Sequence, residues 1–537
     1  MFVLLAFIIS FSLPAQTVQR PKLVVGIVVD QMRWDYLYRY YDRYAENGGF
    51  KRMLNQGFSC ENTFIPYAPT VTACGHASIY TGSVPAVNGI TGNFWYDNLL
   101  NKTVYCTEDA TVKTVGSNTT AGLQSPRNMF SNTIGDELRL ATNFRSKVVG
   151  VALKDRGSIL PAGHTANAAY WYDSKTGDWI TSTFYMEELP QWVKTFNAKK
   201  LVDQYFKTGW NTLYPINTYV QSTADENAYE NKPFGSDAKG FPYNLSKFAG
   251  TNYGVLPSTP FGNTLTAEMA KAAVINEQLG ADAITDLLAV SFSSTDYVGH
   301  SFGPNSIEAE DIYLRLDKEL GDLFTFLDSK VGKDQYTVFL SADHGAAHVP
   351  AFISDHKSPG NLVNTNAIVD TLNATLKNKF GKEKLVIDIS NNRVDLNLPL
   401  IESGQLNMKE IKTLIINYLG KQPGIARAFD IDDIQTTPLN AKVRVMLNNG
   451  YYPNRCGQIQ LVLQPQWLEG TSPRGTSHGL WNPYDSHIPL VWYGWGINKG
   501  KTNRETYMTD IASTLAALLH IQMPNGSVGD VIQEVIK

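Results

Sequence analysis

The chain is long enough to bury a large core, and its charges nearly balance. It has 537 residues, and 46 basic and 50 acidic side chains leave a formal net charge of −4 at pH 7. This balance provides no basic surface for nucleic acid and no polybasic anchor for a membrane.

The first residues are typical of an export signal. Residues 2–13 are apolar except for Ser10 and Ser12, and Pro14-Ala15-Gln16 follows with a small residue suited to cleavage. The run is too short to cross a membrane as a helix, and no other run reaches the roughly 18 apolar residues that a span needs. Because no Lys or Arg precedes the run, a buried first strand is the alternative. We expect a signal peptide at 1–15, a mature chain at 16–537, and a periplasmic or secreted protein with no membrane span.

The rest of the chain alternates between predicted strands and helices. Apolar runs predict strands at 23–30, 147–154, 287–293, 335–341 and 488–493. Helical patterns follow at 129–143, 264–279, 307–330 and 509–520, the last capped by Thr509-Asp510. Continuously apolar strands are typical of a parallel sheet covered on both faces. The predicted fold class is therefore α/β.

Two stretches interrupt this alternation. Residues near 165–260 are rich in aromatic residues and glycine, with weak periodicity. Residues near 365–475 resemble an α+β insertion, in which Arg444–Leu447 followed by Asn448-Asn449-Gly450 predicts a strand and a turn. We expect both to be insertions that cap the active site of one catalytic domain.

Carboxylate and imidazole side chains follow several predicted elements. Asp30 closes the first predicted strand, and Asp343 and His344 follow the fourth. An Asp at the carboxyl end of a parallel strand points into the crevice where open α/β sheets bind ligands. Adjacent Asp343 and His344 can serve one metal only on a bend, which Gly345 favours.

A second group of candidate ligands lies elsewhere in the chain. Asp296 and His300 are four residues apart, so one helical turn places them on the same face. His478 and His487 compete for the place of a further ligand. Asp and neutral His suit a divalent metal of borderline softness. We expect structural or surface roles for the remaining histidines, which are His76, His164, His348, His356 and His520. Asp35, Asp97 and Asp485 are expected either to support the metal ligands from behind or to be structural.

Four other residues suit phosphoryl chemistry. Thr72 precedes a helix-like run, and a helix N-terminus presents N–H groups to a phosphate. Lys154 and Arg156 are charges at a strand end in the simplest interpretation. As i and i+2 of a strand they would point to one face, with Asp155 turned away, and would suit the oxygens of a phosphoryl group. Asn93 is either a turn residue or an uncharged donor to that group.

The motifs that contain these residues resemble the alkaline phosphatase superfamily. The chain is most similar to the phosphate-irrepressible bacterial alkaline phosphatases with a threonine nucleophile, which are related to the type I phosphodiesterase/nucleotide pyrophosphatase enzymes. The matching stretches are LVVGIVVDQMRWDYL, PTVTACGHASIYTGSVPAVNGITGN, KDRGSILPAGH, SSTDYVGH, SADHG and GTSHGLWNPYDSHIPL. They run from about Asp30 to His487, so the resemblance spans nearly the whole mature chain.

The resemblance implies an alkaline-phosphatase-like sandwich with two Zn²⁺ ions, in which Thr72 is the nucleophile. It assigns one zinc to Asp296, His300 and His478; the other to Asp30, Asp343, His344 and the Thr72 oxygen; and the phosphoryl group to Asn93, Lys154 and Arg156. The implied activity is hydrolysis of phosphate monoesters through a phosphothreonine intermediate, for phosphate scavenging outside the cytoplasm.

Two alternative functions remain open. The first is a nucleotide pyrophosphatase/phosphodiesterase of the same superfamily, although those enzymes lack the pair formed here by Lys154 and Arg156. The second is a non-catalytic metal- or phosphate-binding protein, which should have lost a ligand or the nucleophile.

The four cysteines are Cys60, Cys74, Cys106 and Cys456. An even number in an exported protein permits two disulfides, with three possible connectivities. Cys74 stands where the family often has proline. We expect it to be a small buried residue, with a stray zinc ligand or a disulfide partner as alternatives.

Overall fold

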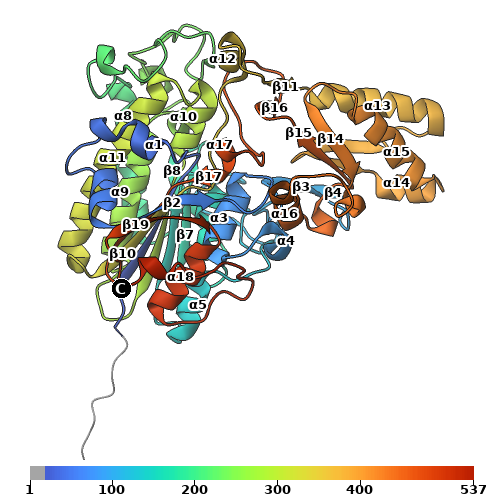
Figure 1. Cartoon of the computed structure of the whole chain (residues 1–537). Helices are drawn as coiled ribbons and strands as arrows, with labels where there is room; N and C mark the ends of the chain where they lie inside the picture. The colour runs from blue at the N-terminus through green and yellow to red at the C-terminus, as the bar shows by residue number, and fades with distance from the viewer. Residues whose placement is uncertain (1–18) are drawn as a thin grey trace, which may run out of the picture.

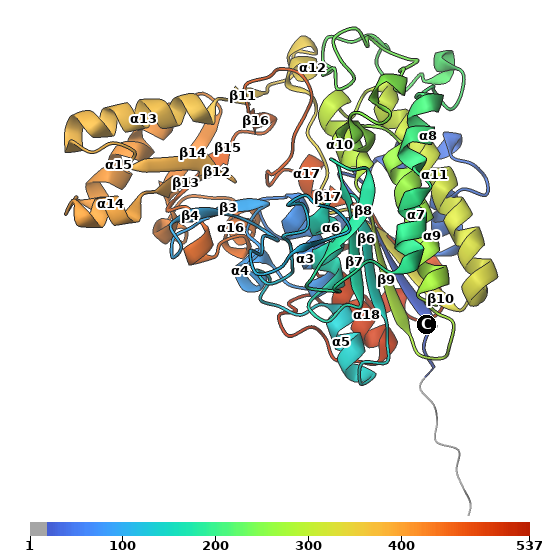
Figure 2. The same ribbon diagram turned by 180° about the vertical axis from the view of Figure 1, so that it is seen from behind.

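The computed structural model describes residues 19–537, and the expected signal peptide at 1–15 lies outside the described residues. A large sheet forms the centre of the molecule, with helices on both faces (Figure 1). A smaller α/β unit projects from one side of this body, as both views show (Figure 2).

The large sheet contains eleven strands of the described chain in the order β17-β2-β18-β10-β1-β9-β6-β7-β8-β5, with β19 paired to β2. Its central strands β10, β1, β9, β6 and β7 are parallel, and antiparallel strands flank them. The prediction of an α/β fold around a mostly parallel sheet is confirmed. The strands are β1 Leu23–Val29, β2 Phe58–Phe64, β5 Thr114–Val115, β6 Val148–Ala152, β7 Ala168–Asp173, β8 Asp178–Ser182, β9 Asp286–Phe292, β10 Tyr336–Ser341, β17 His487–Ile488, β18 Leu490–Gly494 and β19 Gly500–Tyr507.

Helices cover both faces of this sheet. Helices α9 (Phe261–Asn276) and α11 (Ile307–Leu327) lie on one face, and α3 (Thr72–Thr81), α5 (Ile134–Ala141) and α18 (Asp510–Leu519) lie on the other (Figure 1, Figure 2). The remaining helices of this body are α1 Tyr36–Arg39, α2 Gly49–Gln56, α4 Pro85–Asn88, α6 Asp155–Ala162, α7 Gln191–Ala198, α8 Leu201–Thr208, α10 Ser294–Phe302, α12 Pro350–Asp355 and α17 Pro483–Ser486. A short hairpin joins β3 (Phe94–Asp97) to β4 (Lys102–Tyr105).

The carboxyl ends of the parallel strands define where a site can form. Strands β1, β6, β9 and β10 are buried along their whole length, because apolar side chains on both faces pack under the covering helices. Polar residues follow where each strand ends. Since parallel strands end at the same edge of a sheet, these polar side chains meet at one place.

The projecting unit lies between residues 361 and 469 and has an apolar core of its own, which includes Leu372, Val394 and Ile411. A four-stranded sheet in the order β12-β13-β15-β14 forms one layer. Its strands are β12 Val386–Ser390, β13 Arg393–Leu396, β14 Ile425–Asp430 and β15 Ile459–Leu463. Its helices are α13 Thr365–Phe380, α14 Leu398–Ser403, α15 Met408–Leu419 and α16 Ala441–Asn449. Where the unit joins the body, β11 Asn361–Val363 pairs with β16 Trp467–Glu469. We call it the inserted unit.

The predicted strand at Arg444–Leu447 is wrong, because these residues belong to helix α16. Val443, Met446 and Leu447 are its buried residues, and their spacing of three and four positions is helical. The Asn440 side chain accepts a hydrogen bond from the Lys442 N–H and starts the helix.

Several predicted boundaries shift for local reasons. The helix expected from residue 129 starts at Ile134, because Thr133 and Asp136 form a capping box there. The strand expected at 147–154 ends at Ala152. The strand expected at 488–493 divides into β17 and β18 at Pro489, which has no N–H to donate to a ladder.

All four cysteines are free and buried in this structure, so the disulfides that their number permitted are not formed. The Cys74 thiol donates to Ile90 O at 3.1 Å, which confirms the expected small buried residue. Within residues 19–537, no helix is both long enough and apolar enough to span a membrane.

Candidate active site

Asp296, His300 and His478 form a first cluster of possible metal ligands. Asp296 and His300 lie one turn apart on helix α10, with His300 Nε2 3.1 Å from Asp296 Oδ1. His478, from the loop before α17, places its Nε2 3.8 Å from the same oxygen. Their ligand atoms lie within 4.8 Å of one another.

Asp30, Asp343 and His344 form a second cluster beside the first. His344 Nε2 lies 3.6 Å from Asp30 Oδ1 and 3.5 Å from Asp343 Oδ2. Asp343 lies on a bend after β10, as its adjacency to His344 required. Ligand atoms of Asp30, Asp296 and His344 also lie within 4.8 Å of one another, so Asp296 belongs by distance to both clusters.

Backbone carbonyls orient the three histidines. His300 Nδ1 lies 2.7 Å from Thr476 O, His478 Nδ1 lies 2.8 Å from Thr70 O, and His344 Nδ1 lies 2.9 Å from Gly345 O. A carbonyl oxygen can only accept, so each Nδ1 carries a proton, and in the neutral imidazole each Nε2 keeps its lone pair. That lone pair faces the carboxylates, which is the arrangement of a metal-binding histidine held by an outer partner.

The electrostatics of the clusters also suit a cation. Burial, together with the neighbouring Asp30, raises the pKa of Asp343 well above its usual value. Burial lowers the pKa of His344 to about 4, so this imidazole is neutral. In the described part of the chain, Asp30 Oδ1 and Asp343 Oδ2 have no hydrogen-bond partner. Buried carboxylate oxygens without partners are costly unless a cation compensates for them.

Thr72 is the first residue of helix α3 and is buried beside the clusters. Its side-chain oxygen is 3.4 Å from His344 Nε2 and 3.4 Å from Lys154 Nζ. The helix start aims backbone N–H groups at the same place. Gly75 allows the helix to approach this closely, because a Cβ there would collide with Asp343.

Lys154 is positioned differently from the expectation. Strand β6 ends at Ala152, and Lys154 is the residue that precedes helix α6, so the interpretation of Lys154 and Arg156 as one strand face is wrong. Lys154 Nζ lies 2.7 Å from Asp30 Oδ2 and 2.6 Å from Asp296 Oδ2. Burial opposes its charge, but the Asp296 and Asp30 carboxylates outweigh burial and raise its pKa.

Arg156 and Asn93 are held by separate partners. Arg156, in the first turn of α6, donates from NH1 to Tyr105 OH at 3.0 Å. The Tyr105 hydroxyl in turn donates to Asp155 Oδ1 at 2.5 Å. Asn93 Oδ1 accepts from the Ala73 N–H at 2.9 Å. Because an N–H needs an acceptor, the amide oxygen of Asn93 faces helix α3 and its NH₂ group points elsewhere.

Two neighbours of the clusters were not identified as site residues from the sequence. Gln31 Nε2 donates to Asp296 Oδ1 at 2.7 Å, and its backbone N–H donates to Asp343 Oδ1 at 3.1 Å. His76, expected to be structural or on the surface, is buried with Nδ1 2.9 Å from Thr72 O and 3.4 Å from Asp343 Oδ2. In the sequence, only their positions could have indicated a place at the site. Gln31 follows Asp30, and His76 lies one helical turn after Thr72.

The other candidates lie outside the clusters. His487 Nε2 lies 3.0 Å from Glu61 O, and its ring stacks on Trp34, so the preference for His478 agrees with the geometry. Asp35 pairs with Arg33. Asp97 accepts hydrogen bonds from the backbone N–H groups of Leu99 and Leu100, and Asp485 accepts one from the backbone N–H of Leu480. A ring nitrogen of His164 lies against Met129 O, and one of His356 lies against Phe352 O.

Sequence comparisons agree with this geometry. The family described as type I phosphodiesterase / nucleotide pyrophosphatase matches residues 24–485. The chain is 54% identical over 522 residues to alkaline phosphatase PhoV of Synechococcus elongatus, covering 97% of this chain and 94% of PhoV. It is 50% identical over 534 residues to alkaline phosphatase PafA of Elizabethkingia meningoseptica, covering 98% and 97%. A protein of Myroides odoratus named calcium-transporting ATPase is 54% identical over 533 residues, covering 98% and 97%.

Solved structures extend the comparison. Wild-type PafA superposes on this chain with a TM-score of 0.95 at 50% identity, covering 97% of this chain and 100% of PafA. Murine ectonucleotide pyrophosphatase/phosphodiesterase 5 shares the fold with a TM-score of 0.52 at 15% identity. Fold and relatives together define a hydrolase of the alkaline phosphatase superfamily. Within that superfamily, the chain belongs to the type I phosphodiesterase / nucleotide pyrophosphatase family.

Proposed function

We propose that this chain is an exported di-zinc alkaline phosphatase that hydrolyses phosphate monoesters through a phosphothreonine intermediate. The observation that carries the proposal is the arrangement around Thr72. Three buried carboxylates and three histidine Nε2 atoms gather next to its hydroxyl. The relatives PhoV and PafA, both named alkaline phosphatases, support the same activity.

The donor set fits zinc. Neutral imidazole nitrogens and carboxylate oxygens are the ligands that zinc prefers. We assign Asp296, His300 and His478 to one ion, and Asp30, Asp343, His344 and the Thr72 oxygen to the other. When bound, the two ions would supply positive charge that polarises the phosphoryl oxygens and lowers the pKa of the Thr72 hydroxyl.

Thr72 performs the covalent chemistry. Its Oγ1 loses its proton and attacks phosphorus, and the Oγ1–P bond forms as the bond from phosphorus to the alcohol oxygen breaks; the departing oxygen takes up a proton and leaves as the alcohol. Water then attacks the phosphothreonine and breaks the Oγ1–P bond; one water proton returns to Oγ1, and hydrogen phosphate is released. The N-terminus of α3 favours the negative charge that gathers beside Thr72 in both steps.

Lys154, Arg156 and Asn93 hold the phosphoryl oxygens. The Lys154 ammonium is 3.4 Å from Thr72 Oγ1, next to the place where the phosphoryl group must bind. Arg156 presents a guanidinium fixed by Tyr105, and Asn93 has an NH₂ group turned away from α3. A PafA variant in which one threonine, one asparagine, one lysine and one arginine are replaced has been crystallised; those four residue types match this set.

Phosphate scavenging outside the cytoplasm is the role that fits such an enzyme, given the apolar run at residues 2–13. A fusion of residues 1–20 to a reporter tests export.

A substrate panel on the purified chain tests the activity, with zinc content measured. It should contain aryl and alkyl monoesters, an aryl diester, a phosphonate, a sulfate ester and ATP with and without calcium. We expect the highest kcat/KM for the monoesters, without a calcium requirement. A diester preference would favour a phosphodiesterase, and no turnover of any substrate would favour a non-catalytic binding protein.

A further inference from the structure

The turn between β12 and β13 of the inserted unit reaches the candidate active site. Ser390 pairs with Arg393, so Asn391 and Asn392 form a two-residue hairpin turn. Their φ angles are +52° and +58°. Such turns favour asparagine, which adopts positive φ at lower cost than most other residues.

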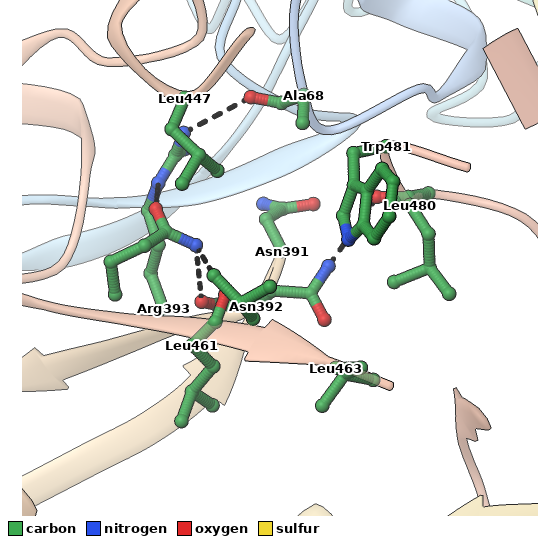
Figure 3. Close-up of a pocket in the computed structure, with 12 residues that line it drawn as sticks. Ala68, Asn391, Asn392, Arg393, Leu447, Leu461, Leu463, Leu480 and Trp481 are labelled. Carbon is green, nitrogen blue, oxygen red and sulfur yellow. Dashed lines mark hydrogen bonds between the residues drawn. The ribbon is translucent and has the colours of Figure 1, made fainter. Parts of the chain in front are cut away.

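Asn391, Asn392 and the next residue, Arg393, donate to three different segments of the body that contains the large sheet, here called the catalytic body. Figure 3 shows the hydrogen bond from Arg393 to Ala68. Asn391 Nδ2 donates to Phe94 O at 2.9 Å. Asn392 Nδ2 donates to Gly479 O at 3.3 Å. Arg393, which is 3% exposed, donates from NH2 to Ala68 O at 3.2 Å.

Each accepting carbonyl lies close in sequence to a residue of the proposed mechanism. Phe94 follows Asn93, Gly479 follows His478, and Ala68 leads into the segment that ends at Thr72. The inserted unit therefore contacts the backbone of three site segments that are far apart in the chain.

The contact to Phe94 acts on the segment that contains Asn93. Asn93 precedes the short strand β3, and its amide is fixed to α3 only through the Ala73 N–H. Asn391 fixes the carbonyl of Phe94, the residue after Asn93, and the Cys106 N–H donates to the carbonyl of Asn93 itself at 3.0 Å. The contact is close, because a Cβ on Gly92 would collide with Asn391. With its side-chain oxygen held by α3 and the backbone after it held by Asn391, the Asn93 NH₂ group keeps one direction.

We propose that Asn391 is a positioning residue for Asn93: by holding Phe94 O, it aims the Asn93 amide at a phosphoryl oxygen and so contributes to monoester hydrolysis from outside the catalytic body. This inference rests on the proposed function. Asn391 touches no reacting atom, so it acts entirely through Asn93.

Two variants remove the contact in different ways. Asn391→Gly deletes the side chain and keeps a residue suited to positive φ. Asn391→Asp keeps the shape, but its carboxylate cannot donate to Phe94 O. Asn397→Asp is the matched control, since Asn397 lies in the same unit, caps α14 through Leu400, and aspartate also caps helices.

We expect both Asn391 variants to lose about tenfold in kcat/KM for an aryl monoester, because small displacements of a positioned group slow the reaction. Diester hydrolysis, zinc content and melting temperature should stay at wild-type values, and Asn397→Asp should match the wild type. Asn93→Ala should itself lose about a hundredfold. In that background, either Asn391 change should cost less than about twofold, since a residue that acts through Asn93 has nothing left to position.

Additive losses in the double variants, or wild-type monoester activity in Asn391→Gly or Asn391→Asp, would overturn the positioning role. Equal losses for monoester and diester would show a general structural effect instead. A wild-type chain that fails to hydrolyse monoesters would refute the proposed function, and this result is distinct from an active enzyme in which Asn391 has no effect.

Discussion

Lys154 Nζ lies 2.6 Å from Asp296 Oδ2, so the proposed phosphoryl-binding lysine pairs directly with a proposed metal ligand. Burial opposes ionisation of Asp296, but His300 and Lys154 outweigh it and hold the pKa of its carboxyl well below the usual range. Substrate binding and metal binding therefore depend on one shared carboxylate. Any substitution of Lys154 must be read together with the metal content.

The role of Lys154 and Arg156 can be tested by substrate charge. A monoester dianion presents three free oxygens, whereas a diester presents one fewer and would leave donors unpaired, at about 1–3 kcal/mol each. We expect the Lys154→Ala/Arg156→Ala variant to lose monoester hydrolysis steeply while diester hydrolysis changes little. The measurement is kcat/KM for matched aryl esters, with zinc quantified in each sample. Equal losses for both esters at full zinc occupancy would assign the pair to the fold.

Thr72→Ala removes the proposed nucleophile and keeps six other ligands. We expect the rate to fall by at least about a thousandfold, as loss of a nucleophile does elsewhere, while metal remains bound. Mass spectrometry of acid-quenched wild type should find phosphate on Thr72, and Thr72→Ser, which keeps a hydroxyl, should retain part of the activity. Phosphate on another side chain would contradict the mechanism.

Metal removal should abolish activity, and zinc should restore it. Elemental analysis should find about two ions per active chain, because the ligands form two clusters. His300→Ala should weaken mainly the binding of the ion assigned to Asp296, His300 and His478. Asp343→Asn should weaken mainly the binding of the ion assigned to Asp30, Asp343 and His344. A single ion in fully active protein would rule out the di-zinc arrangement.

Stability should fall as the pH rises, through a buried carboxyl pair that the proposed mechanism does not use. Burial raises the pKa of Glu308 to about 8, and burial with the neighbouring Glu308 raises that of Glu230 to about 9. Both groups are neutral in the folded chain at pH 7 but ionised in the unfolded chain. A carboxyl whose pKa is higher in the folded chain than in the unfolded chain stabilises the folded state fully only below the unfolded pKa, near 4.5. This stabilisation is lost progressively as the pH rises to the folded pKa values of about 8 and 9.

Glu308→Gln removes one of these titrations and keeps an oxygen that accepts from Tyr243 OH. We expect the melting temperature of the wild type to fall more steeply than that of Glu308→Gln between pH 6 and pH 9, values that span the shifted range. Parallel melting curves would show that this carboxyl does not govern the pH dependence.

Much of the fold followed from local patterns. The continuous apolar runs before Asp30, Asp296 and Asp343 predicted buried parallel strands, because only strands covered on both faces are apolar throughout. The hydrophobic pattern gave a wrong prediction at Arg444–Leu447, where a strand was expected and a helix is found. Over only four residues, a helix with a narrow buried face cannot be told from a short strand.

The sequence alone determined which residue types were available for the site and where along the strands they stood. Asp30 and Asp343 had to meet at one edge, because parallel strands end together. Only the tertiary structure decided their partners. Lys154 pairs with Asp30 and Asp296, Gln31 links Asp296 to Asp343, and the turn at Asn391 contacts the segment of Asn93. These contacts join residues far apart in the chain, and local propensity contains no information about packing between distant segments.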